Sequence, residues 1–135
     1  MTDTVTAEAL RADALYPSLT VSDLQTSYAW YRDVLGFEVE REMVRDGVMR
    51  AVSLRSGAVR FLLNQDDGAK GLNRPRGSCM SMNLVTHQNV DAVAARIKEH
   101  GGSLLSEPAD MPWGMRVFRV ADPDGYVYAV SQPLG

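Results

Sequence analysis

Apolar and polar positions along the chain alternate in two recurring ways, with the periods of strands and of helices. The first half is predicted to form a strand, a helix and three strands, at residues 15–21, 22–36, 37–45, 48–55 and 58–64. In the helix, Leu24, Tyr28, Tyr31 and Leu35 recur at helical spacing, and Gly36 ends it. Turn signals separate the three strands, which are expected to form a meander.

The second half repeats this order. It is predicted to form a strand, a helix and three strands at residues 79–86, 89–100, 103–106, 115–120 and 126–131. Ser22 or Asp23 can cap the first helix, and Asn89 can cap the second. The pattern predicts an α+β fold of two tandem βαβββ units. The repeat rests on pattern alone, because the two halves share little residue identity.

The expected organisation is one domain after a short N-terminal segment. Residues 1–14 are small, polar and alanine-rich, which indicates a loose arm. Residues 15–135 form the predicted domain, with units at about 15–65 and 79–132. A chain of 135 residues can bury roughly two-thirds of the surface that its unfolded form exposes, enough for one core.

Composition narrows the functional classes. The net charge of -3 and the scattered basic residues argue against a nucleic-acid partner. No apolar run approaches the ~20 residues that cross a bilayer, so no membrane partner is expected, and residues 1–13 lack the apolar stretch of an export signal. The single cysteine, Cys79, cannot form an internal disulfide, which favours the reducing cytoplasm.

Several motifs resemble those of the vicinal oxygen chelate superfamily, which includes glyoxalases, extradiol dioxygenases and bleomycin-resistance proteins. The resemblance implies that the two units form a cupped mixed β-sheet with the helices on its outside. The similar stretches are residues 21–24, 28–37, 89–102 and 118–125. Residues 112–116 are similar to a stretch of the bleomycin-resistance-like branch, to which the chain is therefore assigned as nearest. The glycines and the proline of these motifs specify turns rather than chemistry, so the site has to be argued separately.

The resemblance implies four positions for the ligands of a divalent metal, two in each unit. Mapped by motif, they fall on Tyr16, Phe61, Met82 and Ala129, and none of these side chains is a usual ligand for Mg, Mn, Fe or Zn. His87 is expected in a loop and His100 at a helix C-terminus, where a cation complements the helix dipole. The sequence therefore predicts that the chain has lost its metal site and uses no cofactor.

The same positions would instead form an apolar, aromatic and sulfur-containing surface for a flat organic molecule. Ser18 and Leu84 join them by strand alternation. Trp113 is expected to stack on a ligand from a loop, and Arg116 to pair with an anionic group or stack on a ring. Such aromatic and methionine residues are also frequent in cores, which is the simpler explanation for Trp30 and Tyr31.

Three functions remain open. The first is a metal-free protein that sequesters a small aromatic or glycopeptide-like compound, such as an antibiotic, as a homodimer in which each chain helps to close the other's cavity. The second is a lyase, isomerase or dioxygenase whose metal site the motif alignment misses, although the expected cup offers only Tyr16 and hydroxyls for proton transfer. The third is a regulatory or interaction module with a vestigial cavity.

Overall fold

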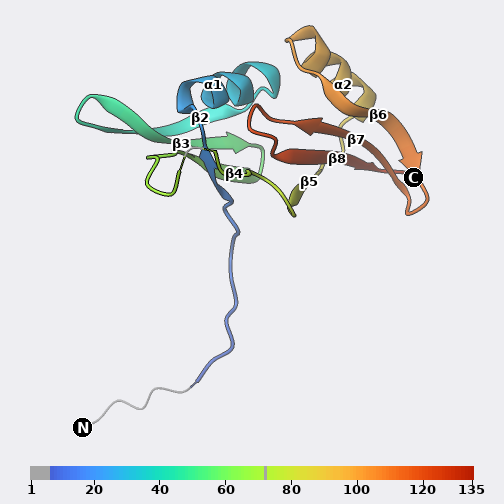
Figure 1. Ribbon diagram of the computed structural model, residues 1–135. Helices are drawn as coiled ribbons and strands as arrows, with labels where there is room; N and C mark the ends of the chain where they lie inside the picture. Colours follow the sequence, from blue (N-terminus) through green and yellow to red (C-terminus); the bar gives the residue numbers. More distant parts are fainter. Residues whose placement is uncertain (1–6, 72) are drawn as a thin grey trace.

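The computed structural model describes residues 7–71 and 73–135, and these form two successive βαβββ units (Figure 1). The first unit contains β1 (Ser18–Val21), α1 (Leu24–Ala29), η1 (Trp30–Val34), β2 (Glu38–Arg45), β3 (Val48–Ser56) and β4 (Val59–Gln65). The second contains β5 (Ser81–Val85), α2 (Val90–Glu99), β6 (Leu104–Met111), β7 (Met115–Ala121) and β8 (Val127–Pro133). The predicted α+β class and the repeated order are confirmed.

Each unit builds one four-stranded mixed sheet. The strand orders are β1-β4-β3-β2 and β5-β8-β7-β6. In each sheet the first strand runs parallel to the last, and the remaining pairs are antiparallel. The predicted meander is therefore present in both units.

Local sequence signals fix where the helices begin and end. The side chain of Asp23 accepts a hydrogen bond from the backbone N–H of Gln25 at 3.2 Å, and Asn89 accepts one from Ala92 at 3.1 Å. At the other end of the first helix, Gly36 has a φ of 81°, which favours glycine and turns the chain out of the helix. The first helix ends in a π-helical turn, η1, which the sequence pattern did not predict.

One strand is longer than expected. The sequence predicts a strand over residues 103–106, whereas β6 continues through Pro108 to Met111. Proline has no backbone N–H to donate, but β6 is an edge strand and its pairing with β7 shifts register between Ser106 and Ala109. The irregularity accommodates the proline, so the strand can resume beyond it.

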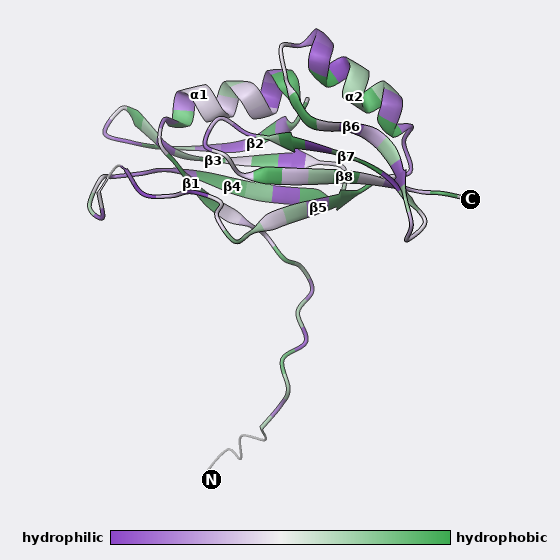
Figure 2. Cartoon of the chain, turned by 45° about the vertical axis from the view of Figure 1, so that its right-hand side comes forward, coloured by the Kyte–Doolittle hydropathy of each residue, from purple (hydrophilic) through white to green (hydrophobic). Residues whose placement is uncertain are grey.

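Both helices lie on the same side of the sheets, and among the described residues the opposite side carries no helix (Figures 1 and 2). The side chains between helices and sheets form one core that includes residues from both units, among them Tyr31, Phe61, Phe118 and Tyr128. We call the opposite side of the two sheets the open face. It carries the strand residues that alternate with the core residues.

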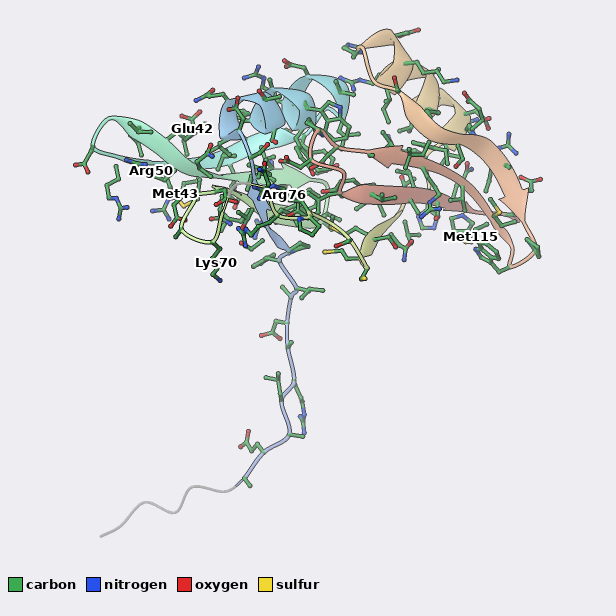
Figure 3. The ribbon with its side chains drawn as sticks, in the orientation of Figure 1. Glu42, Met43, Arg50, Lys70, Arg76 and Met115 are labelled. Carbon is green, nitrogen blue, oxygen red and sulfur yellow. The ribbon has the colours of Figure 1, made fainter. Side chains whose placement is uncertain are left out.

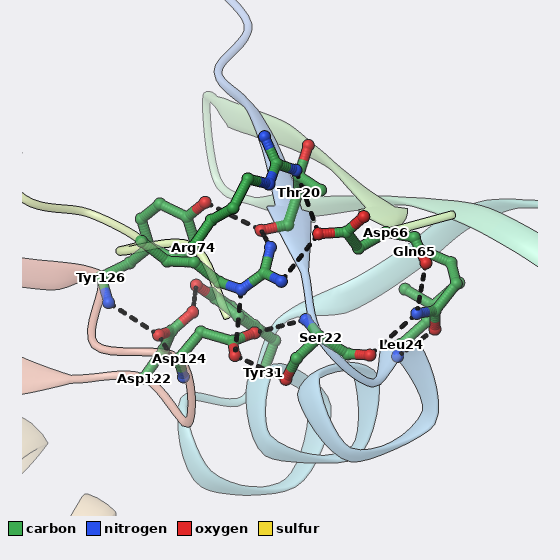
Figure 4. A network of polar contacts seen from close by, with 11 residues as sticks. Thr20, Ser22, Leu24, Tyr31, Gln65, Asp66, Arg74, Asp122, Asp124 and Tyr126 are labelled. Atoms are coloured by element: carbon green, nitrogen blue, oxygen red, sulfur yellow. Dashed lines mark hydrogen bonds and ion pairs between the residues drawn. The ribbon is translucent and has the colours of Figure 1, made fainter. Parts of the chain in front are cut away.

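A polar network joins the two units behind this core (Figure 4). Asp66 follows β4, is 6% exposed, and accepts hydrogen bonds from Arg74 at 3.0 Å and from Arg76 at 2.7 Å. In addition, Asp124 of the second unit accepts two hydrogen bonds from Ser22 of the first, at 2.9 and 2.6 Å. Residues far apart in sequence thus hold the units in a fixed arrangement.

The N-terminal arm expected at residues 1–14 falls partly on residues 1–6, outside the described residues. Residues 7–14 form no helix or strand and are exposed. Within residues 7–71 and 73–135, no helix is long and apolar enough to cross a membrane.

Candidate ligand-binding face

Strand pairing assigns the predicted site residues to one face or the other. Paired residues of neighbouring strands project to the same side. In the first sheet Leu19 pairs with Leu63, and both belong to the core, whereas the next pair along, Ser18 with Leu62, projects to the open face. In the first unit, every second residue of β1 and of β4 therefore lies on the open face, including Ser18 and Leu62.

Two polar pairs organise this part of the open face. Asn64 donates a hydrogen bond of 2.7 Å from Nδ2 to Oγ of Ser18. Arg60 lies 3.5 Å from the hydroxyl of Tyr16 and forms a 3.0 Å ion pair with Glu40. The hydrogen bond to Tyr16 and the charge of Glu40 raise the pKa of the Arg60 guanidinium. Tyr16 and Ser18 thus lie on one surface, as expected.

Phe61 does not lie on that surface, and the expectation that it shares a face with Tyr16 is wrong. It is 2% exposed and packs in the core. Its ring lies 5.1 Å from that of Phe37 and 5.9 Å from those of Tyr31 and Tyr128, measured between centroids. The motif mapping was one residue out of register, which moves a strand residue to the opposite face.

The same correction applies to the second unit. Met82 pairs with Tyr128 and Leu84 with Val130, and both pack against the core rather than on the open face. Ala129 pairs with Asn83 and does lie on the open face. Of the four positions that the motif alignment mapped, Tyr16 and Ala129 are on the expected side, and Phe61 and Met82 are not.

The corrected register does not bring in metal ligands. The open-face neighbours are Arg60 and Leu62 on either side of Phe61, and Ser81 and Asn83 on either side of Met82, and none of them is a usual ligand for a divalent ion. Across the part of the chain that the structure describes, no group of three or more His, Cys, Asp or Glu side chains could hold a metal. His87 lies exposed in the loop before α2, and His100 caps the C-terminus of α2. The donor set therefore does not fit the metal that the fold family implies.

Arg116 forms ion pairs within the chain, so the expectation that it binds a ligand is not supported. Its guanidinium binds both carboxylate oxygens of Asp91 at 2.8 and 2.9 Å, and Asp110 at 2.9 Å. Asp91 belongs to α2, so Arg116 projects to the helix side. These bonds lower the pKa of Asp91 and raise that of Arg116.

Trp113 is 69% exposed in the turn between β6 and β7. Met115, two residues further on, lies toward the far end of the second unit, whereas Arg76 lies at the junction of the units (Figure 3). The turn that holds Trp113 is therefore distant from the first unit of the same chain. An indole exposed to this degree is available for stacking.

The open face can bind, but it offers little for acid–base chemistry. Its described groups on β1, β4, β5 and β8 and beside them are mainly hydroxyls, amides, alkyl groups and the guanidinium groups of Arg60 and Arg119, and the Glu40 carboxylate is paired with Arg60. Sequence reasoning missed Arg60, Asn64 and Asn83 as members of this face. Strand alternation along β4 puts Arg60 and Asn64 on the same face, but which face that is depends on the parallel pairing of β4 with β1, which the sequence does not reveal.

Comparisons with known proteins agree with this architecture. The model of the Glyoxalase/Bleomycin resistance protein/Dioxygenase superfamily matches residues 13–130. An uncharacterized protein of Mycobacterium bovis is 29% identical over 128 residues, which cover 90% of this chain and 84% of that protein.

Solved structures with the same fold include those of the proteins TnmS3 and TioX. TnmS3, an antibiotic binding protein from Streptomyces sp. CB03234, is 26% identical, with a TM-score of 0.72 over 93% of this chain and 99% of its own. TioX from Micromonospora sp. ML1 is 19% identical, with a TM-score of 0.71 over 91% and 100% of the two chains. At this identity, the similarity to TioX shows the fold alone.

Proposed function

Because the chain belongs to the Glyoxalase/Bleomycin resistance protein/Dioxygenase superfamily, we propose that it binds a small organic compound without a metal ion. It protects the cell by sequestering this compound. The observation that carries the proposal is the composition of the open face. At or next to the four positions that the motif mapping assigned to metal ligands, the open face carries Tyr16, Leu62, Ser81 and Ala129. Stoichiometric binding needs no catalytic group, so this loss is compatible with function.

The open face suits a flat, partly polar ligand. Leu62, Ala129 and the ring of Tyr16 supply apolar area, while Ser18 and Asn83 supply groups that accept or donate hydrogen bonds. Trp113 provides a further exposed ring for stacking. An antibiotic with fused or linked aromatic rings matches these features, and the antibiotic binding described for TnmS3 supports this choice of ligand class.

The proposal includes a homodimer in the cytoplasm. Neither helix of the described residues covers the open face, and the turn that holds Trp113 lies toward the far end of the second unit, so a partner chain would close the face and bring an exposed indole to the ligand (Figures 1 and 3). The single free thiol of Cys79 is compatible with a reducing compartment. Sedimentation at micromolar concentration should give a dimer, and a monomer alone would remove this part of the proposal.

Tryptophan fluorescence tests ligand binding directly. The chain has two tryptophans, Trp30 and Trp113, of which Trp113 is exposed. Titration with bleomycin and a panel of planar aromatic antibiotics should quench the emission saturably with at least one compound. The variant Trp113→Phe should lose the quenching, whereas Trp30→Phe should retain it.

A matched pair of substitutions locates the site. Ala129→Phe places a ring on the open face and should weaken binding at least tenfold. Ala95→Phe makes the same change on an exposed position of α2 and should leave the affinity unaltered. Equal affinities of the two variants, or turnover of the ligand into a new product, would contradict binding at this face without catalysis.

A further inference from the structure

A hollow lies between the two units on the helix side, away from the open face. It has a volume of about 470 Å³, within the roughly 300–1,000 Å³ of ligand pockets. The first unit contributes Leu35, Phe37 and the β3–β4 turn, and the second contributes β5, α2 and β8. We call this space the inter-unit cleft.

The interior of the inter-unit cleft is apolar. Its walls include the core residues Phe37, Ile97, Val120, Tyr128 and Val130, which are between 0% and 7% exposed. Because the open-face residues Tyr16, Ser18 and Ala129 do not line this space, it is separate from the site proposed above. An alkyl or aryl group would gain free energy by leaving water for this interior.

A cation lies beside the cleft. Gly36 and Arg96 line a neighbouring hollow that shares Gln88, Val93 and Ile97 with the inter-unit cleft, so the two adjoin. Nη1 of Arg96 donates a hydrogen bond of 2.9 Å to the carbonyl of Val34, which ties α2 to the end of η1.

The backbone beside it is shaped to accept this guanidinium. A Cβ atom at Gly36 would lie only 3.1 Å from Cζ and Nη1 of Arg96, so the glycine lets the guanidinium lie against the chain. Held in this way, Arg96 keeps its guanidinium in the hollow that adjoins the inter-unit cleft. A guanidinium pairs well with a carboxylate in this arrangement.

We propose that the inter-unit cleft binds an amphipathic carboxylate, with its alkyl or aryl group between the units and its carboxylate on Arg96. The occupied cleft would connect α2 to the end of η1, so the ligand would also stabilise the arrangement of the two units. This site is independent of the open face and of any ligand bound there.

Octanoate and octan-1-ol, which share an eight-carbon chain and differ in head group, test the proposal. In an NMR titration with isotopically labelled protein, octanoate should shift the amide signals of Leu35, Gln88 and Val93, and leave those of Ser18 and Ala129 in place. Octanoate should bind more tightly than octan-1-ol. Shifts confined to the open face, or equal affinities for the two probes, would overturn the proposal.

Substitutions separate the charge from the apolar interior. Arg96→Gln should weaken octanoate binding about tenfold and leave octan-1-ol binding unchanged, while Arg96→Lys should retain part of the preference. Val93→Trp should block both probes, and Ala95→Trp on the outer side of α2 should block neither. Ala129→Phe should leave octanoate binding intact, which distinguishes failure here from failure of the open-face site. If Arg96→Gln folds and binds octanoate as tightly as the native chain, the assignment is wrong.

Discussion

The hydroxyl of Tyr31 donates a hydrogen bond of 2.7 Å to Oδ2 of Asp122, which lies 91 residues further along the chain and 5% exposed. Tyr128 lies 2.7 Å from the same hydroxyl and, since Tyr31 gives its proton to Asp122, acts as the donor. Burial raises the pKa of Asp122 and of both tyrosines. The three side chains join η1 of the first unit to β8 and the last turn of the second.

Tyr31→Phe should therefore lower the free energy of unfolding without changing the fold. The substitution leaves the buried Asp122 carboxylate with one donor fewer, and such a loss costs about 1–3 kcal/mol of unfolding free energy. Urea denaturation measures it. Tyr16→Phe, which removes an exposed hydroxyl, should change the unfolding free energy by less than about 0.5 kcal/mol. Similar values for the two variants would show that the buried contact contributes nothing.

Two adjacent residues of β4 test which face each occupies. Phe61→Ala should cost about 3–5 kcal/mol of unfolding free energy, because it opens a cavity in the core. Leu62→Ala on the open face should cost about 1 kcal/mol or less and should weaken ligand binding instead. The reverse order of destabilisation would restore the motif-based register.

Acid should destabilise the native chain partly through Asp66. The backbone N–H of Gly68 and the side chains of Arg76 and Arg74 hold the pKa of its carboxyl well below the ordinary value near 4. The unfolded chain therefore takes up this proton first as the pH falls, so the stability that Asp66 contributes is complete above about pH 4 and is lost below it.

Thermal melts between about pH 5 and pH 2 follow this loss. Asp66→Asn should be less stable than the native chain at neutral pH, and the difference should shrink as the pH falls through this range. A difference that stays constant with pH would mean that the two arginines do not stabilise the ionised carboxylate.

Arg116→Met should lower the melting temperature and leave ligand binding on the open face unchanged, since its ion pairs with Asp91 and Asp110 lie on the helix side. The loss should be larger at low salt, because ions screen exposed pairs. Arg119 lies three residues further along β7, on the open face and paired with Ala129. Arg119→Met is therefore the matched substitution on the ligand-binding side. If Arg116→Met abolishes binding while the chain remains folded, Arg116 contacts the ligand after all.

Local chemistry explains why the fold could be predicted so closely from the sequence. Asp23 and Asn89 cap the helices through their own side chains, and Gly36 ends the first one through its backbone angle, so each signal acts within a few residues. The faces of Phe61 and Met82 depend instead on parallel pairing with strands far away in the sequence. A shift of one residue there reverses the face, which is why the fold was predicted correctly whereas Phe61 and Met82 were assigned to the wrong face.

Arg116 illustrates a second limit of the sequence. Its position near a loop suggested an available cation, but its partners, Asp91 on α2 and Asp110 on β6, are brought to it only by tertiary packing. The same holds for Arg96, whose place beside the inter-unit cleft follows from the contact between α2 and the end of η1.

Metal content measures the central claim most directly. Elemental analysis of the purified protein, before and after incubation with Mg, Mn, Fe, Ni and Zn followed by removal of free ions, should give close to zero metal per chain throughout, with ligand quenching of tryptophan emission unaffected by chelators. One tightly held ion per chain would contradict the account, because it would mean that the open face, or residues outside the described part of the chain, supply a metal site for superfamily chemistry.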